Sequence, residues 1–274
     1  MAGKLYIVST PIGNLGDMTK RAMEVLAAAD YIAAEDTRRT LALLNSLGIG
    51  GRLLSCHEHS SPAKIAHIVS LLEEGADIAL CTDAGTPIIS DPGAPLTELA
   101  AQRGIEIVSV PGACAAIAAL TVSAIPAKKF VFEGFLPRDK ARKQALKTAC
   151  AHPYTTVLYE SPHQLAKTLS ELAQICPERK IAVCKELTKL HESVLRTSVL
   201  EAAEHFQKEE ARGEYVLVLE GAKESTTKEV ADDEIAALLR TFIERGMRKK
   251  EAVLTAAQQL SVSKNRAYEI MLKL

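Results

Sequence analysis

The chain lacks the features that would place it in a membrane or outside the cell. No apolar run approaches the roughly 18 residues that a membrane-spanning helix needs. The opening Met1-Ala2-Gly3-Lys4 leads into a strand-like run and does not read as a signal peptide. The six cysteines form no Cys-x-x-Cys pair, so we expect reduced thiols in the core. We therefore predict a cytoplasmic protein that does not contact the membrane.

The common nucleotide-binding loops are also absent. The chain contains no Gly-x-Gly-x-x-Gly and no phosphate loop of the form Gly-x-x-x-x-Gly-Lys-Ser/Thr. A net charge of −1 argues against a protein that coats nucleic acid nonspecifically. Two segments are nevertheless basic: residues 126–150 and residues 245–274 each carry seven Lys or Arg against two Asp or Glu, a local charge of +5. Taken alone, each is better explained as a solvated helix face.

The first 125 residues predict an N-terminal α/β domain. Short strand-like runs alternate there with helical apolar spacing, which predicts a mainly parallel sheet covered by helices. Strands are expected at residues 5–8, 31–34, 53–56, 78–81 and 105–110. Helices are expected at residues 19–29, 37–47, 63–74, 94–103 and 113–120, with Asp17 and Ser61 as candidate caps or near-caps.

A domain boundary is expected near Ile125-Pro126, where the first basic segment begins. Residues 126–222 predict a second α/β domain, whose fewer crossovers indicate a mixed sheet. Its strands are expected at residues 130–133, 156–159, 181–185, 194–197 and 215–219, and its helices at residues 138–149, 163–175 and 200–210.

The polar stretch 223–228 predicts a linker, and residues 228–274 predict a small C-terminal helical module. Within it, residues 251–260 and 264–272 could form a helix-turn-helix. Such a pair either packs only against its neighbours or presents a basic helix to RNA or to a second protomer, and the sequence leaves these alternatives open.

Three loops after expected strands carry the residues from which α/β folds build ligand sites. The first, at residues 9–17, contains Gly13 and Gly16; the second, at residues 81–93, is longer than a simple connection needs. Pro111-Gly112-Ala113 forms the third. Since the carboxyl ends of parallel strands meet at one edge, we predict that the three loops share a rim that holds a nucleoside-sized ligand.

Seven motifs, in order across residues 5–221, together resemble the ribosomal RNA small subunit methyltransferase I family. They are Thr10-Pro11-Ile12-Gly13-Asn14-Leu15, Thr82-Asp83-Ala84-Gly85-Thr86-Pro87 with Ser90-Asp91-Pro92-Gly93, Pro111-Gly112-Ala113, Phe132-Glu133-Gly134-Phe135-Leu136-Pro137, Tyr159-Glu160-Ser161-Pro162-His163, Glu186-Leu187-Thr188-Lys189 and Gly213-Glu214-Tyr215-Val216.

The resemblance implies a two-domain tetrapyrrole-methylase fold with S-adenosylmethionine as methyl donor. It also implies 2′-O-methylation of a cytidine in the decoding region of small-subunit ribosomal RNA, within the small ribosomal subunit, by a homodimer. By the same resemblance, the expected cofactor-binding residues are Pro11, Gly13, Asn14, Asp83, Gly85, Ile88, Ser90, Cys114 and Ala115.

Three positions bear on the substrate. The first loop departs from the Gly-x-Gly-Pro-Gly of the broader tetrapyrrole pattern, which favours the RNA branch. Within that branch, Lys185 and Gln164 stand where arginine is common. Lysine keeps the charge without the planar fork and glutamine loses both, so contacts from these positions to substrate are in doubt.

The sulfonium of the cofactor needs no activation, so catalysis is expected to align the ribose hydroxyl and ease its proton loss, without a metal. Candidates in the segment 185–192 are Glu186, Lys189, His191 and Glu192. We predict Lys189 and Glu186 as the catalytic residues, because a lysine can stabilise an alkoxide or, with a depressed pKa, accept a proton. Without the resemblance, a surface ion-pair cluster is the simpler interpretation.

The predicted contacts to RNA phosphates are Arg138, Lys140, Arg142 and Lys143. With aromatics at 4% and no tryptophan, shape and backbone contacts are expected to outweigh base stacking. His57-Glu58-His59 offers two histidines without a third ligand, so a solvated strand end is the better explanation, and a substrate-side role stays open.

Two alternative functions stay open. The chain could methylate a tetrapyrrole or another small molecule, against which the two basic segments count. It could instead be a non-catalytic RNA-binding ribosome assembly factor, against which the intact loop glycines and Asp83 count.

Overall fold

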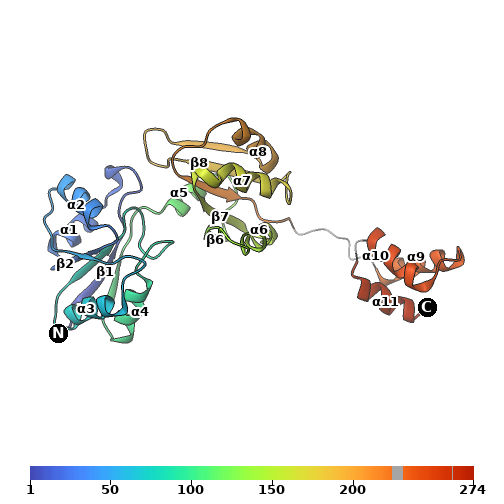
Figure 1. Ribbon diagram of the computed structural model, residues 1–274, viewed down its shortest axis with the longest axis horizontal. Helices are drawn as coiled ribbons and strands as arrows, with labels where there is room; N and C mark the ends of the chain where they lie inside the picture. Colours follow the sequence, from blue (N-terminus) through green and yellow to red (C-terminus); the bar gives the residue numbers. More distant parts are fainter. Residues whose placement is uncertain (224–230, 261) are drawn as a thin grey trace. The chain divides into compact units, whose positions relative to one another are not determined.

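The computed structural model describes residues 1–223, 231–260 and 262–274, which form two compact units, 1–222 and 223–274. The larger unit contains two five-stranded sheets (Figure 1). Among the described residues, no helix is long and apolar enough to cross a membrane.

The first sheet is parallel throughout, with strand order β3-β2-β4-β1-β5. Its strands are β1 (Lys4–Val8), β2 (Tyr31–Ala34), β3 (Leu53–Ser55), β4 (Ile78–Cys81) and β5 (Glu106–Val110). Helices α1 (Lys20–Ala28) and α2 (Thr37–Ser46) pack on one face, and α3 (Pro62–Glu73) and α4 (Ala94–Gln102) pack on the other. The predicted mainly parallel sheet is therefore confirmed.

One of the two expected helix caps is confirmed. Ser61 caps α3 by accepting a hydrogen bond from the Lys64 amide. The cap of α1 is Thr19, which accepts from the Ala22 amide, whereas Asp17 lies in a separate turn of 3₁₀ helix. Asp17 ends the turn η1 (Leu15–Asp17), two residues before Thr19, so it lies near the cap of α1 without being the cap.

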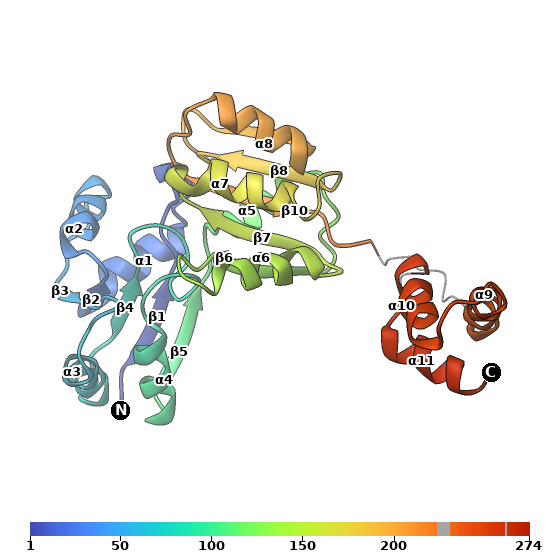
Figure 2. The ribbon, with the colours of Figure 1, turned by 45° about the vertical axis from the view of Figure 1, so that its right-hand side comes forward.

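The second sheet is mixed, as predicted, with strand order β6-β7-β10-β8-β9. Its strands are β6 (Phe130–Phe135), β7 (Thr155–Glu160), β8 (Lys180–Lys185), β9 (Ser193–Ser198) and β10 (Tyr215–Leu219). Only β6 and β7 pair in parallel. Helices α6 (Arg142–Ala151), α7 (Pro162–Ala173) and α8 (Val199–Lys208) cover one face (Figure 2).

The opposite face of the second sheet is covered by α5 (Ala115–Val122). Ala119 and Leu120 of this helix pack with Val157 and Ala182. The core of the first sheet thus ends at Val110, one helix before the boundary expected at Ile125-Pro126. An alanine-rich helix carries little information about which sheet it covers, and the sequence pattern did not indicate that α5 packs on the second sheet.

The smaller unit consists of α9 (Asp232–Glu244), α10 (Lys249–Gln259) and α11 (Lys264–Leu272). It has its own apolar core, to which Leu239, Val253 and Ile270 belong. The expected linker at 223–228 lies, apart from Lys223, outside the described residues. The last two helices follow the predicted helix-turn-helix closely.

Candidate functional site

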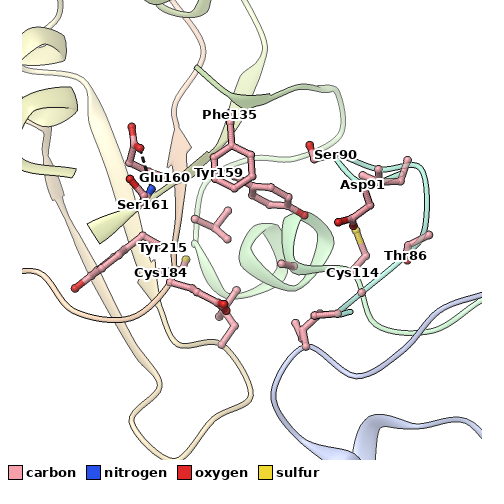
Figure 3. Close-up of a pocket in the computed structure, with 18 of the residues that line it drawn as sticks. Thr86, Ser90, Asp91, Cys114, Phe135, Tyr159, Glu160, Ser161, Cys184 and Tyr215 are labelled. Atoms are coloured by element: carbon pink, nitrogen blue, oxygen red, sulfur yellow. Dashed lines mark hydrogen bonds between the residues drawn. The ribbon is translucent and has the colours of Figure 1, made fainter. Parts of the chain in front are cut away.

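A cavity of about 340 Å³ lies between the loops that follow β1, β4 and β5 and one end of the strands of the second sheet (Figure 3). This volume falls within the range of small-molecule sites. The first domain contributes Ile12, Ala84, Gly85, Thr86, Ile89, Ser90 and Asp91, and the segment entering α5 contributes Cys114 and Ala115. The second domain contributes Phe135, Tyr159, Glu160, Ser161, Pro162, Cys184, Leu187, Glu214, Tyr215 and Val216.

Hydrogen bonds join the three loops of the first domain into one rim. The amide of Thr10 donates to the carbonyl of Gly85 over 2.8 Å, and the amide of Gly85 donates back over 3.1 Å. The Thr86 hydroxyl donates to the Ala113 carbonyl over 3.0 Å and lies 3.0 Å from the Ser9 hydroxyl. The prediction that the three loops share one rim is confirmed.

The long loop after β4 holds two non-glycine residues in the left-handed region of backbone space, Ile88 with φ 77° and Ser90 with φ 64°. This backbone conformation is costly for residues other than glycine, and residues that adopt it are concentrated at functional sites. The loop presses against β6, because a Cβ at Gly134 would lie 2.8 Å from Ser90 Oγ. Gly134 follows a bulge in that strand, which lets the two domains approach closely here.

Asp91 is the acidic side chain of this loop that faces the cavity (Figure 3). Burial, the neighbouring Glu35 carboxylate and, to a smaller extent, Asp83 raise its pKa to about 6. The nearby Thr82 hydroxyl partly offsets this rise by lowering the pKa. A carboxyl group with this pKa can gain or lose a proton near neutral pH.

Tyr159 fixes the start of α5 against the second sheet. Its hydroxyl accepts a hydrogen bond from the Ala116 amide over 3.1 Å, and its ring packs edge-on against Phe132 and Phe135. Burial raises the pKa of the phenol, so Tyr159 stays neutral. The ring gives the cavity a rigid apolar wall.

Glu160 brings a buried carboxylate to the cavity. It accepts hydrogen bonds from the Ser161 amide over 2.8 Å and from the Thr168 hydroxyl over 2.5 Å. Thr168 in turn accepts from the Arg142 guanidinium over 2.6 Å, and Arg142 also pairs with Glu171 over 2.9 Å. These bonds fix the orientation of Glu160.

These hydrogen bonds also give Arg142 a structural role. Its residue surface is only 6% exposed, whereas Arg138, Lys140 and Lys143 are exposed. The expectation that Arg142 contacts RNA phosphates conflicts with this burial. Position 142 starts α6 on the side facing the core, which a run of basic residues does not reveal.

Lys189 and Glu186 form an ion pair just outside the cavity lining. Lys189 Nζ lies 2.9 Å from a carboxylate oxygen of Glu186 and 2.9 Å from one of Glu214. Burial lowers the pKa of Lys189, but the two carboxylates outweigh it and raise the pKa overall. Burial raises the pKa of Glu186, but hydrogen bonds from Lys189 and from the Glu214 amide outweigh it and lower the pKa overall. Both groups therefore stay charged near neutral pH.

Two glycines make room for this ion pair. A Cβ at Gly13 would lie 2.4 Å from Lys189 Cγ, and a Cβ at Gly213 would lie 2.6 Å from Glu186 Cδ. The first loop of the chain and the turn between β8 and β9 therefore touch at Gly13 and Lys189. Glu186 and Thr188 in that turn also have positive φ, at 51° and 65°, and the Thr188 hydroxyl is buried without a partner among the described residues.

The nine predicted cofactor residues divide into two groups. Gly85, Ser90, Cys114 and Ala115 line the cavity. Pro11, Gly13, Asn14, Asp83 and Ile88 are not among the residues that line it. Of these, Asn14 accepts from the Gly16 amide, and Asp83 pairs with Arg39 over 2.9 Å.

The cavity also includes residues that the sequence did not single out as cofactor-binding, among them Asp91, Phe135, Tyr159, Glu160 and Tyr215. All five belong to the quoted motifs. Their position in a motif could therefore have indicated that they belong to the site. Only the fold, however, brings β7 and β10 to the loops of the first sheet.

His57 and His59 do not lie on a strand, since β3 ends at Ser55. They occupy a turn in which the Ser60 amide donates to the His57 carbonyl over 2.9 Å. Among the described residues, no group of three or more His, Cys, Asp or Glu is placed to hold a metal ion.

Comparison with known proteins gives the family. The family model described as Tetrapyrrole (Corrin/Porphyrin) Methylases matches residues 4–203. The chain is 42% identical to "Ribosomal RNA small subunit methyltransferase I" of Escherichia coli O157:H7, over 99% of this chain and 95% of that one. It is 47% identical over 219 residues to the protein of the same name from Thermotoga maritima, which covers 80% of this chain and 99% of the relative.

Solved structures share the fold at low identity. Uroporphyrin-III-C-methyltransferase from Thermus thermophilus has a TM-score of 0.55 at 22% identity and covers 80% of this chain and 94% of its own. Diphthine synthase has a TM-score of 0.63 at 12% identity, over 80% of this chain and 90% of its own. The chain belongs to the tetrapyrrole methylase family and, within it, to the ribosomal RNA small subunit methyltransferase I family.

Proposed function

We propose that the chain transfers a methyl group from S-adenosylmethionine to the ribose 2′-oxygen of a cytidine in the decoding region of small-subunit ribosomal RNA. The observation that carries the proposal is 42% identity over 99% of the chain to a relative named for this ribosomal RNA. The cavity between the two sheets supplies the physical site.

The residues of the cavity fit S-adenosylmethionine. Tyr159 and Phe135 offer aromatic surface. Cys114 precedes α5 without a side-chain cap, so the first amides of the helix, other than that of Ala116, which donates to Tyr159, can meet polar edges of a nucleoside. Glu160 and Glu214 place carboxylates beside a cofactor that carries an ammonium and a sulfonium. When bound, the cofactor supplies an electrophilic methyl group on sulfur.

The chain's own residues orient the acceptor and manage charge. Lys189, as an ammonium held by Glu186 and Glu214, contributes positive charge at the rim where an oxygen atom becomes more negative during transfer. Glu186 acts by holding Lys189 in place. The raised pKa of Lys189 favours this electrostatic role over proton acceptance.

The exposed Arg138, Lys140 and Lys143 offer positive charge to RNA phosphates in the segment that follows the cavity-lining Phe135 and the two residues after it. We propose that the substrate is presented within the small ribosomal subunit and that the enzyme acts in the cytoplasm as a homodimer.

The test is transfer of labelled methyl from S-adenosylmethionine to small ribosomal subunits from a strain that lacks the enzyme. Nuclease digestion and mass spectrometry would then locate the product. We expect 2′-O-methylcytidine in the decoding region. Cofactor binding without transfer to subunits or naked RNA would refute the proposal, and transfer to a uroporphyrinogen acceptor would support the small-molecule alternative.

A further inference from the structure

A second cavity, of about 180 Å³, shares Asp91 with the first. Its walls are the turn after β3, with Cys56, His57 and Ser60, and the start of α4, with Gly93 and Ala94. The volume is smaller than that of a site enclosing a drug-sized ligand, so it suits part of a larger substrate.

Backbone hydrogen bonds build the first wall of this cavity. The His57 amide donates to the Ser60 hydroxyl over 2.9 Å, the Ser60 amide donates back to the His57 carbonyl over 2.9 Å, and the Cys56 amide donates to the Ala34 carbonyl over 2.7 Å. This leaves the His57 ring exposed at the opening. An imidazole is one of the rings on which RNA bases stack.

The second wall is equally constrained. Gly93 has φ 126°, and a Cβ there would lie 2.7 Å from Leu80 Cδ2, so the chain turns tightly from Asp91 into α4. The carboxyl group of Asp91 is thereby held where the two cavities meet.

Asp91 is surrounded by groups that disfavour its charge. Glu35, just after β2, and Asp83, in its own loop, raise its pKa, and the Tyr159 phenol lies across the first cavity. The Thr82 hydroxyl, which donates to Glu35 over 2.8 Å, acts in the opposite direction and lowers the pKa of Asp91. Among the residues of the second cavity, His57 and Glu58 are also titratable.

We propose that the second cavity receives the acceptor nucleoside and that Asp91 is the residue that takes the proton from its ribose 2′-hydroxyl. This inference rests on the proposed function. As the oxygen forms its bond to the methyl carbon, the carbon–sulfur bond breaks with its electrons staying on sulfur, and the hydroxyl proton moves to the Asp91 carboxylate. The pKa of about 6 suits this role, because the carboxylate is mostly ionised at pH 7 and still accepts a proton.

Glu186 and Lys189 are less suited to accept this proton. The carboxylate of Glu186 has a lowered pKa and the amine of Lys189 has a raised pKa, and neither residue lines either cavity. Their ion pair is therefore assigned an electrostatic role and not proton transfer.

The occupancy of the second cavity can be tested with Ala94→Leu, which enlarges a side chain of its wall, and with Ala101→Leu, a control at an exposed position of the same helix that does not line the cavity. Protein loaded with S-adenosylhomocysteine is titrated with cytidine, and side-chain resonances of His57 are followed by NMR. We expect shifts at His57 in the parent and in Ala101→Leu, and their loss in Ala94→Leu. Shifts that are absent in the parent, or that persist in Ala94→Leu, would overturn the assignment of the cavity.

The role of Asp91 is tested with Asp91→Asn by methyl transfer and calorimetry. We expect transfer at saturating S-adenosylmethionine to fall about 10²-fold or more, as for loss of a general base. This loss should exceed any change in cofactor affinity, which calorimetry measures separately because Asp91 also lines the cofactor cavity. The rate of the parent should rise with pH through about 6, and Glu35→Gln should move this rise to lower pH by removing a neighbouring charge. Transfer by Asp91→Asn within threefold of the parent would refute the proton-accepting role.

The outcomes separate the two proposals. If the parent methylates subunits but Asp91→Asn and Ala94→Leu do so equally well, the proposed function stands and the inference fails. If the parent methylates no RNA, the proposed function fails, and the cytidine titration still decides whether the second cavity binds a nucleoside.

Discussion

At the scale of single residues, two glycines far apart in the chain determine where an ion pair can lie. Gly13 and Gly213 leave space that the side chains of Lys189 and Glu186 fill. A glycine in a motif can thus mark a position where another segment of the chain packs closely, and the structure identifies that segment.

We expect Gly13→Ala to lower the free energy of unfolding by about 1–3 kcal/mol, because its Cβ overlaps Lys189. Methyl transfer should fall at least tenfold as Lys189 moves away from Glu186. Urea titration and transfer assays provide the measurements. Gly48→Ala is the matched control, since Gly48 also has positive φ but has no atom within 4 Å of its added Cβ. Equal effects of the two variants would mean that backbone strain, and not the contact with Lys189, is responsible.

Asp91 should make stability depend on pH. Its pKa rises on folding from 3.8 to about 6, so the folded state binds more protons between these values and stability falls as pH rises through this window. The shift corresponds to about 3 kcal/mol, which screening of this half-buried carboxyl by solvent reduces. We therefore expect Asp91→Asn to gain, relative to the parent, about 2 kcal/mol of unfolding free energy between pH 3.5 and pH 8. Denaturant titrations of both proteins at the two pH values measure this difference. A difference that does not change with pH would contradict the raised pKa.

At the scale of elements, α6 carries two kinds of basic residue on different sides. Arg142 points into the core and supports Glu160 through Thr168, while Lys143 is exposed. Of two neighbouring basic residues, one therefore stabilises the core and the other is exposed to solvent, where a substrate can reach it.

We expect Arg142→Met to reduce the unfolding free energy by about 2–3 kcal/mol, because Thr168 and Glu171 lose charged hydrogen bonds. Cofactor affinity should also fall, since Glu160 loses its support. Thermal unfolding and calorimetry test this. Stability equal to that of the parent would show that solvent replaces the guanidinium.

Lys143→Met should leave the unfolding free energy within about 0.5 kcal/mol of the parent, as expected of an exposed position. If Lys143 contacts a phosphate, affinity for small-subunit RNA should fall and the slope of log affinity against log salt should decrease by about 1. Filter binding at several salt concentrations measures both. An unchanged slope would remove Lys143 from the RNA face.

At the scale of the whole molecule, the chain divides into a unit that holds both cavities and a helical unit with a separate core. The Thermotoga maritima relative aligns over 219 residues, which is 99% of its length and close to the 222 residues of the larger unit.

Removal of residues 223–274 should leave the affinity for S-adenosylmethionine within twofold of the full chain, because every residue lining the main cavity lies before residue 223. If the basic helices of this unit contact RNA, KM for small subunits should rise while kcat changes little. Calorimetry and steady-state transfer assays separate the two effects. A large loss of cofactor affinity would show that the helical unit supports the site.

The sequence by itself determined the strands, helices and sheet types of the larger unit. Residues such as Ile78–Cys81 are apolar in a strand-length run followed by a polar loop, and such local patterns need no partner to be recognised. The ordered motifs also determined the family. The main limit at this level was the sheet on which α5 packs, because an alanine-rich helix does not indicate which of its faces is buried.

Only the tertiary structure decided which motif residues meet. It brought Tyr159 and Glu160 to the loop of Asp91, placed Arg142 in the core, and made Asp91 common to two cavities. The physical reason is that burial and charge coupling depend on contacts between segments far apart in sequence. A side chain's pKa and accessibility are set by those contacts, and local residue patterns do not encode them.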